Sequence, residues 1–246
     1  MRIIVVCVCF ILSSIVAIGQ ENRTISGFGN NVDNKSWGSA NSPLLRVSKA
    51  NYADGFELEN DIHLPSPRVI SNNLFAQTDI IPDEHSLSDY VWVFGQFLDH
   101  DITLVESSNE FVFLDIPNDD EFFSPNQNIL TSRNHHIEGT GTDEDNPRQY
   151  MNHISGFVDG SAVYGSDIER ANWLRTLSGD GKLKVSKDDL LPWNTSNGEF
   201  NQPNDPAAPF MADDTKQLNK FFVAGDIRAN EQPTLAAMHT LWVRGH

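Results

Sequence analysis

The sequence predicts a mainly α-helical protein with long loops and little β-structure. Apolar residues recur at helical spacing in segments 88–100, 167–177 and 230–246. Strict alternation of apolar and polar residues, the pattern of a half-buried strand, is rare. Between the helical segments, Gly, Pro, Asn and Asp are scattered through long stretches, as in loops. The 246 residues suit one large domain or part of one.

The N-terminal segment, residues 1–19, has the pattern of a secretory signal peptide. Arg2 supplies a positive charge, residues 3–18 are almost wholly apolar, and Ala17 and Gly19 offer small side chains for cleavage. The apolar run is shorter than the ~20 residues of a membrane span. We therefore expect export and removal of this segment, which leaves residues 20–246 without a membrane attachment. An uncleaved N-terminal anchor is the alternative.

Cysteine content and charge limit the functions open to the mature chain. Both cysteines, Cys7 and Cys9, lie within the signal segment, so the remainder has neither disulfides nor thiolate chemistry. The formal net charge is −17, and removal of the single charge on Arg2 makes it −18. Such a chain is not expected to bind nucleic acid, because phosphate contacts need Lys and Arg. The acidity favours cations, including calcium.

The first half of the chain is predicted to hold one helix between irregular segments. Residues 20–60 are expected to form an extended arm over a surface, with a weak hairpin as the alternative. Residues 64–68 contain two prolines and predict a turn. The helix is predicted to start near Ser88, which can cap it, as can Ser86, and residues 107–150 are predicted to be loop. The apolar face of this helix consists of Tyr90, Val91, Phe94, Phe97 and Leu98.

Two more helices are predicted in the second half. The first covers residues 167–177, with Ser166 or Asp167 as its cap and Gly179 beyond its end. Residues 179–214 are predicted to be loop. The last helix begins near Asn230, has a proline in its first turn where proline is tolerated, and runs to the chain end. Its buried stripe is predicted to be Leu235, Met238, Leu241 and Trp242.

Two short segments carry the residue types of an acid–base site. Residues 95–101, Gly-Gln-Phe-Leu-Asp-His-Asp, place His100 between two carboxylates at the end of the first helix. Residues 224–231, Ala-Gly-Asp-Ile-Arg-Ala-Asn-Glu, place Arg228 in a glycine-containing turn, three residues before a carboxylate. A neutral imidazole can accept and return a proton near neutral pH, and a fixed guanidinium stabilises developing negative charge. Alone, His100 would be a solvated helix-end residue; the two segments together favour a site.

Residues 95–101 followed by residues 224–231 resemble the distal half of the active site of animal-type haem peroxidases, the superfamily that includes myeloperoxidase and peroxidasin. The likeness runs from about residue 24 to residue 246. It implies that His100 moves the peroxide proton and that Arg228 stabilises the departing oxygen. It also implies that Gln96, one helical turn before His100, hydrogen-bonds water or a halide above the haem iron.

The resemblance further implies how haem b is held. Asp99 and Glu231 match two carboxylates that form ester bonds to haem methyl groups in the family. Gln232 stands where some relatives carry Met, which excludes a sulfonium link and makes strong chloride oxidation less expected. The likeness stops before the family's proximal iron ligand, because neither His239 nor His246 matches that motif, and His239 is expected to pack structurally. We therefore expect the N-terminal, distal-side portion of a peroxidase domain, truncated before its proximal half.

A calcium site is the remaining prediction. Residues 155–161, Ser-Gly-Phe-Val-Asp-Gly-Ser, place oxygen donors at alternate positions, which face one side of an extended loop. The segment resembles the family's calcium loop. Because one implied ligand directly follows His100, calcium would hold that histidine in place. The implied ligands are the side chains of Ser155, Asp159 and Ser161, the carbonyl of Phe157, and Asp101.

By this resemblance the full protein is a secreted, calcium-containing haem peroxidase. It would reduce hydrogen peroxide through an oxoferryl intermediate and oxidise halide, pseudohalide or aromatic donors. The lack of cysteines in the mature chain fits a bacterial or invertebrate member better than a vertebrate one. Two other functions stay open. One is a secreted, non-catalytic calcium-binding or adhesion module derived from a peroxidase. The other is a fatty-acid dioxygenase whose catalytic tyrosine lies beyond His246.

Overall fold

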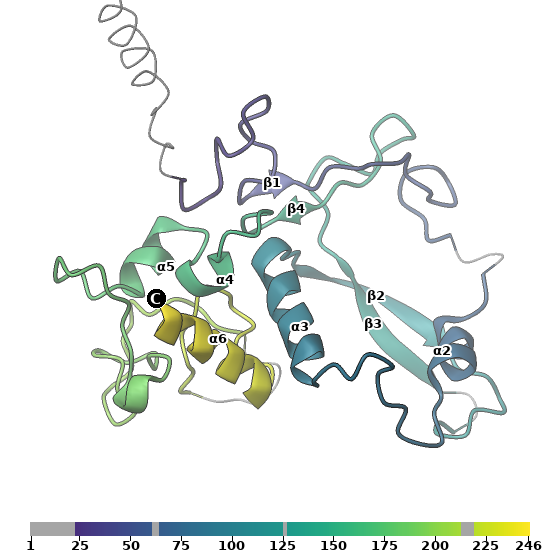
Figure 1. Ribbon diagram of the computed structural model, residues 1–246. Helices are drawn as coiled ribbons and strands as arrows, with labels where there is room; N and C mark the ends of the chain where they lie inside the picture. The colour runs from purple at the N-terminus through teal and green to yellow at the C-terminus, as the bar shows by residue number, and fades with distance from the viewer. Residues whose placement is uncertain (1–22, 61–63, 125–126, 213–218) are drawn as a thin grey trace, which may run out of the picture.

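The computed structural model describes residues 23–60, 64–124, 127–212 and 219–246 (Figure 1). The expected signal peptide lies outside these residues. Within them, no helix combines the length and the apolar character needed to cross a membrane. The elements, in chain order, are β1 (Ser42–Pro43), α2 (Pro67–Phe75), α3 (Tyr90–Ile102), β2 (Ser107–Asp115), β3 (Asn128–Asn134), β4 (Met151–Asn152), α4 (Ser161–Tyr164), α5 (Ile168–Trp173), a 3-10 helix (Lys187–Asp189) and α6 (Pro233–Gly245). The predicted class, mainly α with long loops, is confirmed.

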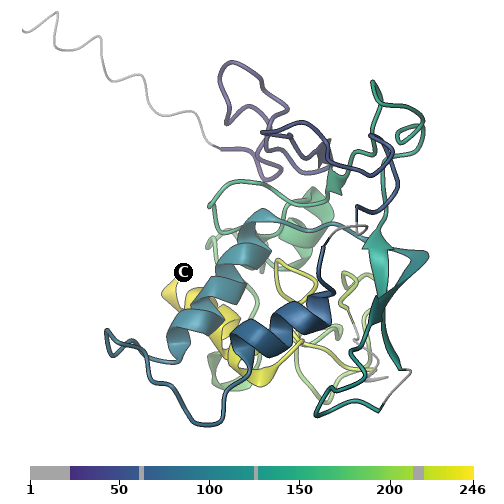
Figure 2. The same ribbon diagram turned by 90° about the vertical axis from the view of Figure 1, so that its right-hand side faces the viewer.

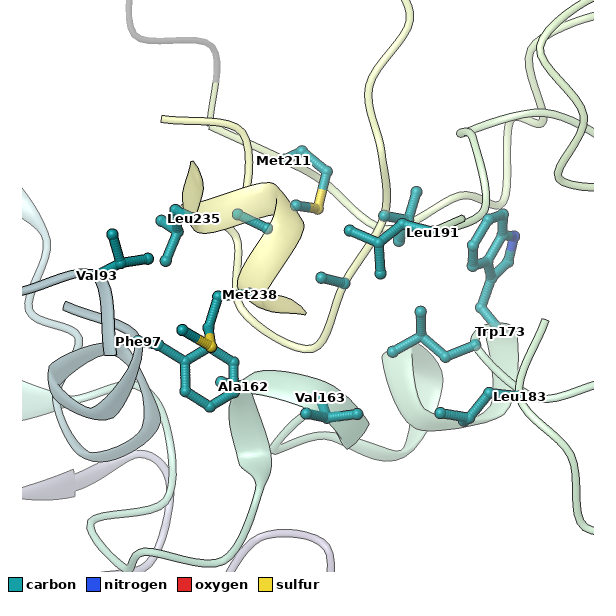
Figure 3. Close-up of a cluster of buried hydrophobic side chains, with 14 residues drawn as sticks. Val93, Phe97, Ala162, Val163, Trp173, Leu183, Leu191, Met211, Leu235 and Met238 are labelled. Atoms are coloured by element: carbon teal, nitrogen blue, oxygen red, sulfur yellow. The ribbon is translucent and has the colours of Figure 1, made fainter. Parts of the chain in front are cut away.

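The main hydrophobic core lies where α3, α4 and α6 meet (Figures 1 and 2). Each fully buried aliphatic or aromatic side chain contributes about 1.5–3 kcal/mol there. The core therefore fixes the end of α3 relative to the loop that precedes α6. Figure 3 shows the side chains that meet: Val93 and Phe97 from α3, Ala162 and Val163 from α4, Trp173 from α5, and Leu235 and Met238 from α6.

The predicted buried faces of α3 and α6 are only partly correct. On α3, Phe97 is buried and Leu98 half-buried, but Tyr90 is 63% exposed and Val91 and Phe94 are also exposed. On α6, Leu235 and Met238 are buried, whereas Leu241 and Trp242 are exposed. The ring of Trp242 nevertheless stacks on that of Phe97, with 5.7 Å between the ring centroids. The remaining apolar side chains line a groove of about 410 Å³ between the two helices.

Helix boundaries follow local capping. The Ser88 hydroxyl accepts from the Tyr90 N–H at 3.3 Å just before α3, although Asp89 is the first flanking residue. Asp167 caps α5 as predicted and accepts from the Arg170 N–H at 2.7 Å. The predicted end of this helix at residue 177 is wrong: α5 ends at Trp173, and Leu177 has a left-handed φ of 54°.

A long β-hairpin replaces part of the predicted loop over residues 107–150. Strands β2 and β3 pair antiparallel, with Phe111 opposite Ser132 and Asp115 opposite Asn128. Successive residues of β2 alternate between exposed and half-buried, as expected for a strand with one covered face. The run of four apolar residues at 111–114 was the strand signal, and the surrounding Asp, Gly and Pro obscured it.

Helix α2 also differs from the prediction, which placed only a turn at residues 64–68. Pro67 occupies the first helical turn, where its missing N–H is not needed. The Ser66 hydroxyl accepts from the Arg68 N–H at 3.1 Å and caps the helix. Arg68 then pairs with Asp120 at 2.6 Å, which ties α2 to the loop after β2.

The one named strand of the N-terminal arm in the described residues, β1, pairs with a distant segment. β1 runs antiparallel to β4, more than a hundred residues later in the chain (Figure 1). The Gly156 N–H donates to the Gly38 carbonyl at 2.8 Å. A methyl group at Gly38, whose φ is 77°, would meet the Phe157 ring at 2.8 Å. The arm thus packs directly on the loop predicted to bind calcium.

Candidate active site

The C-terminal end of α3 and the loop at residues 224–232 form the candidate active site. The loop lies directly on α4, because the Asp226 N–H donates to the Ala162 carbonyl at 3.1 Å. A methyl group at Gly225 would overlap the Ser161 carbonyl oxygen and lie 2.6 Å from the carbonyl carbon of Ala162. Only glycine permits this close approach of two backbones. The approach brings the charged residues of the loop beside the end of α3.

His100 is buried and lies between two carboxylates. Its Nδ1 is 3.8 Å from Oδ1 of Asp226, and its Nε2 is 3.8 Å from Oε2 of Glu231. Burial lowers the pKa of His100, and the Arg228 guanidinium lowers it further, while Asp226 and Asp99 oppose the change. The net shift is downward. The ring is therefore neutral at neutral pH and able to accept a proton.

Arg228 makes four side-chain hydrogen bonds. Its Nε and Nη2 each donate to one oxygen of Asp226 at 2.8 Å. Nη2 also donates to the Thr103 carbonyl at 2.7 Å and to the His100 carbonyl at 3.4 Å. These carbonyls belong to the end of α3, where backbone acceptors lack partners within the helix. The structure thus brings the predicted imidazole and guanidinium together, with Arg228 tying the loop to α3.

Asp226 is the residue that sequence reasoning missed. Its side chain is 1% exposed, and Oδ1 also accepts from the Arg228 backbone N–H at 2.8 Å. An Asp two residues before an Arg in a glycine-containing turn was the available signal, since Asp commonly accepts from the N–H two residues on. That signal does not reveal the contact with His100, which depends on the tertiary fold.

Gln96 lies one turn before His100, as predicted, and bonds to protein groups. Its Nε2 donates to Glu231 Oε2 at 2.8 Å, and its Oε1 accepts from Gln232 Nε2 at 3.0 Å. Asp99 is exposed on α3 beside His100. The structure therefore gathers the predicted residues at one place. The binding of water or halide by Gln96 and of haem by Asp99 and Glu231 stays a prediction.

His239, on α6, is fully buried near this site. Its ring lies edge-on to Phe97, with 4.9 Å between the ring centroids. Within the described part of the chain, neither ring nitrogen has a hydrogen-bond partner. Burial lowers the pKa of His239 to about 4, so the ring is neutral. The expected packing role agrees with this position.

The predicted calcium ligands form one hydrogen-bonded network. Ser155 Oγ donates to Asp159 Oδ2 at 2.6 Å and accepts from the Phe157 N–H at 3.3 Å. Ser161 Oγ donates to the backbone carbonyl of Asp101 at 2.8 Å. The Asp159 N–H donates to Asp101 Oδ2 at 3.2 Å. The hydrogen bonds thus join Ser155 to Asp159, and both Asp159 and Ser161 to Asp101, whereas the role of the Phe157 carbonyl stays a prediction.

The charges in this network favour a cation. Burial raises the pKa of Asp159, and the neighbouring Asp101 carboxylate raises it further, against the Ser155 hydrogen bond. Asp101 also accepts from the Ala162 N–H at 2.7 Å, so backbone donors already hold it. Among the described residues, no three or more His, Cys, Asp or Glu side chains are grouped to hold a metal. A calcium site here would use two carboxylates with hydroxyl and carbonyl oxygens, and stays a prediction.

Known proteins resemble this chain in sequence over nearly its whole length. The family model for animal haem peroxidases matches residues 22–246. Peroxidasin homolog from Homo sapiens is 30% identical over 267 residues, which cover 92% of this chain and 17% of that protein. Thyroid peroxidase from Homo sapiens is 31% identical over 274 residues, which cover 93% of this chain and 29% of that protein. The chain spans less than a third of the length of either relative.

Solved structures share the fold. Peroxidase A from Dictyostelium discoideum superposes with a TM-score of 0.71 at 28% identity, over 92% of this chain and 45% of that one. A fatty acid alpha-dioxygenase from Arabidopsis thaliana gives a TM-score of 0.64 at 20% identity, over 90% of this chain and 30% of that one. The dioxygenase likeness shows the fold alone. The match of the family model to residues 22–246 shows that this chain belongs to the animal haem peroxidase family.

Proposed function

We propose that this chain forms the peroxide-binding side of a secreted haem peroxidase, which reduces hydrogen peroxide and oxidises a small halide, pseudohalide or aromatic donor. One observation supports this most directly. A buried, neutral imidazole, His100, lies beside a guanidinium, Arg228, which is held by a buried carboxylate. Proton transfer and charge stabilisation are the two tasks that peroxide cleavage requires from protein groups.

The residues of this site fit the distal side of a haem. Haem, when bound, supplies an iron centre that exchanges electrons with peroxide and donor. Asp99 is exposed and the Glu231 side chain is 27% exposed, so both carboxylates can reach a group lying over the end of α3. We assign them to haem binding, with ester links to its methyl groups. Gln96, bonded to Glu231, would then orient water or a halide near His100.

His100 performs the proton transfer. Its Nε2 accepts the proton from hydrogen peroxide, because burial keeps the ring neutral. The same nitrogen then returns the proton to the oxygen that leaves as water. Arg228 stays charged throughout and stabilises the negative charge on that oxygen without rearrangement, because Asp226 already fixes its guanidinium.

Calcium at residues 155–161 would stabilise this arrangement. Asp101 directly follows His100 and is bonded to the backbone at 159–162. A cation bound by Asp101 and Asp159 would relieve the repulsion between their carboxylates and fix the end of α3.

The test is peroxide-dependent oxidation by the full-length protein loaded with haem, assayed with iodide and with a phenolic donor. We expect oxidation of at least one donor that depends on both peroxide and haem. Oxygen uptake with palmitate and no added peroxide would point to the dioxygenase alternative. Calcium binding without haem binding would favour the non-catalytic module. Either of these results without peroxidase turnover contradicts the proposal.

A further inference from the structure

Asp226 occupies the centre of the candidate active site. Its carboxylate accepts the Nε and Nη2 donors of Arg228 in a two-pronged arrangement, with both distances 2.8 Å. Such paired, charge-assisted bonds fix a guanidinium in position as well as in orientation. The carboxylate itself is fixed, since the Asp226 N–H is bonded to the Ala162 carbonyl of α4. Arg228 is therefore positioned through Asp226 by the rigid part of the fold.

The same carboxylate faces the inner nitrogen of His100. Nδ1 of His100 is buried and has no hydrogen-bond partner in the described part of the chain, and Asp226 Oδ1 lies 3.8 Å from it. Nε2 has a carboxylate at the same distance, that of Glu231. The two carboxylates differ in environment. Both carboxylates already accept hydrogen bonds, Asp226 from Arg228 and Glu231 from Gln96. They differ in exposure, because Asp226 is 1% exposed and Glu231 is 27% exposed.

This difference decides which nitrogen carries the proton of the neutral ring. A carboxylate shielded from water acts on a neighbouring N–H through a lower effective dielectric constant than a partly solvated one. Asp226 therefore stabilises the tautomer of His100 with its proton on Nδ1 more than Glu231 stabilises the tautomer with its proton on Nε2. A base of this kind works only when its outer nitrogen is unprotonated, and a carboxylate behind the ring is a common way to ensure this.

We propose that Asp226 is a positioning residue with two effects: it fixes the guanidinium of Arg228, and it keeps His100 in the tautomer with its proton on Nδ1. Nε2 of His100 is then left to accept the peroxide proton. The kinetic consequence rests on the proposed peroxidase function, whereas the tautomer and the guanidinium position do not.

The first test is nitrogen NMR of the His100 ring in the full-length protein at about pH 8, where a neutral ring is expected. The wild-type protein should show the proton on Nδ1. In Asp226→Asn the charge behind Nδ1 is lost, so Glu231 should draw the proton to Nε2. Asp205→Asn is the matched control, because Asp205 accepts from the Trp173 indole at 2.9 Å, in a structural role outside the site. In this control variant, the His100 ring should have the same tautomer as in the wild type.

The second test compares the rate of reaction with peroxide in the haem-loaded variants. Asp226→Asn should lower this rate roughly 10–100-fold, the usual effect of losing such a supporting group, with haem still bound. Asp226→Glu keeps the charge and should restore the Nδ1 tautomer better than Asn does. Asp205→Asn should lower thermal stability without changing the rate.

The outcomes separate the inference from the proposed function. A tautomer that changes in Asp226→Asn, in a protein with no peroxidase activity, would support the positioning role and contradict the function. An active enzyme whose tautomer and peroxide rate are both unaffected by Asp226→Asn would overturn the inference and leave the function standing. Equal loss of rate in Asp226→Asn and Asp205→Asn, with no change in tautomer, would mean a merely structural role and would also overturn it.

Discussion

The side-chain amide of Gln96 donates to Oε2 of Glu231 at 2.8 Å, across 135 positions of the chain. The same carboxylate oxygen lies 3.8 Å from Nε2 of His100. The bond therefore fixes the carboxylate that faces the proposed proton-accepting nitrogen. It joins α3 directly to the start of α6 without using the imidazole. Removing the His100 ring thus leaves this connection between the two elements in place.

That independence makes His100→Ala a test of chemistry more than of folding. We expect haem to stay bound and the rate of reaction with peroxide to fall about 10²–10⁴-fold, the usual contribution of a positioned acid–base group. Stopped-flow absorbance of the haem band measures the rate. His135→Ala, which removes an exposed histidine outside the site, should react at the wild-type rate. Equal rates in both variants would exclude His100 from proton transfer.

Gly225→Ala is expected to destabilise the fold strongly. The added methyl group would overlap the backbone of α4 at the Ser161 carbonyl, and backbone atoms cannot rotate away as a side chain can. Overpacking usually costs about 1–3 kcal/mol, and we expect at least the upper end of this range. Urea denaturation followed by circular dichroism measures the change.

Gly95→Ala is the matched control for this change. Gly95 lies inside α3, and a methyl group there would meet no atom within 4 Å. Alanine is the better helix former, so the variant should gain about 0.5–1 kcal/mol of stability. If Gly225→Ala is as stable as the wild type, the loop does not rest on α4 as the structure has it.

Calcium is expected to raise the melting temperature. Ligand at 100 times its dissociation constant stabilises the folded state by about 2.7 kcal/mol, or about 5–10 °C for a chain of this size. Asp159→Asn should abolish the calcium-dependent rise, because it removes one of two carboxylates in the network. Asp145→Asn, at an exposed position, should keep it. A rise that persists in Asp159→Asn would place any calcium elsewhere.

Local patterns in the sequence predict much of this fold, and packing between elements explains the rest. The Asp167 cap and the start of α6 depend on neighbouring residues, and both follow from short motifs, although α6 begins at Pro233, three residues after the predicted start near Asn230. Helical spacing also shows that Tyr90 and Phe94 share a side of α3 with other apolar residues. It does not show which of these residues are covered by α6: of the predicted face, Phe97 is buried, whereas Tyr90 and Phe94 are exposed.

The candidate site shows the same division. His100 and Arg228 follow from sequence motifs, because their residue types and order are distinctive. The contact of Asp226 with His100, in contrast, exists only because Gly225 allows the loop to lie on α4. The hairpin was missed for a related reason. The pairing of Phe111 with Ser132 joins two separate segments, and the sequence of either strand alone does not predict it.

His239 should make stability depend on pH. Its pKa is about 4 in the folded state, because of burial, and near 6.5 when the chain is unfolded. Between these values the unfolded chain binds a proton that the folded protein does not, so the free energy of unfolding falls as pH drops from about 6.5 to 4. The difference corresponds to about 3 kcal/mol, fully present above pH 6.5.

Denaturation at a series of pH values tests this for the wild type and for His239→Leu, which removes the titrating ring from the core. Burial also lowers the pKa of His100 and raises that of Asp159, so both groups add to the pH dependence, and the difference between the two curves isolates the contribution of His239. The variant should lose about 3 kcal/mol of the pH-dependent change, whatever its stability at neutral pH. An unchanged slope in His239→Leu would mean that the ring already finds a partner for its proton in the folded state.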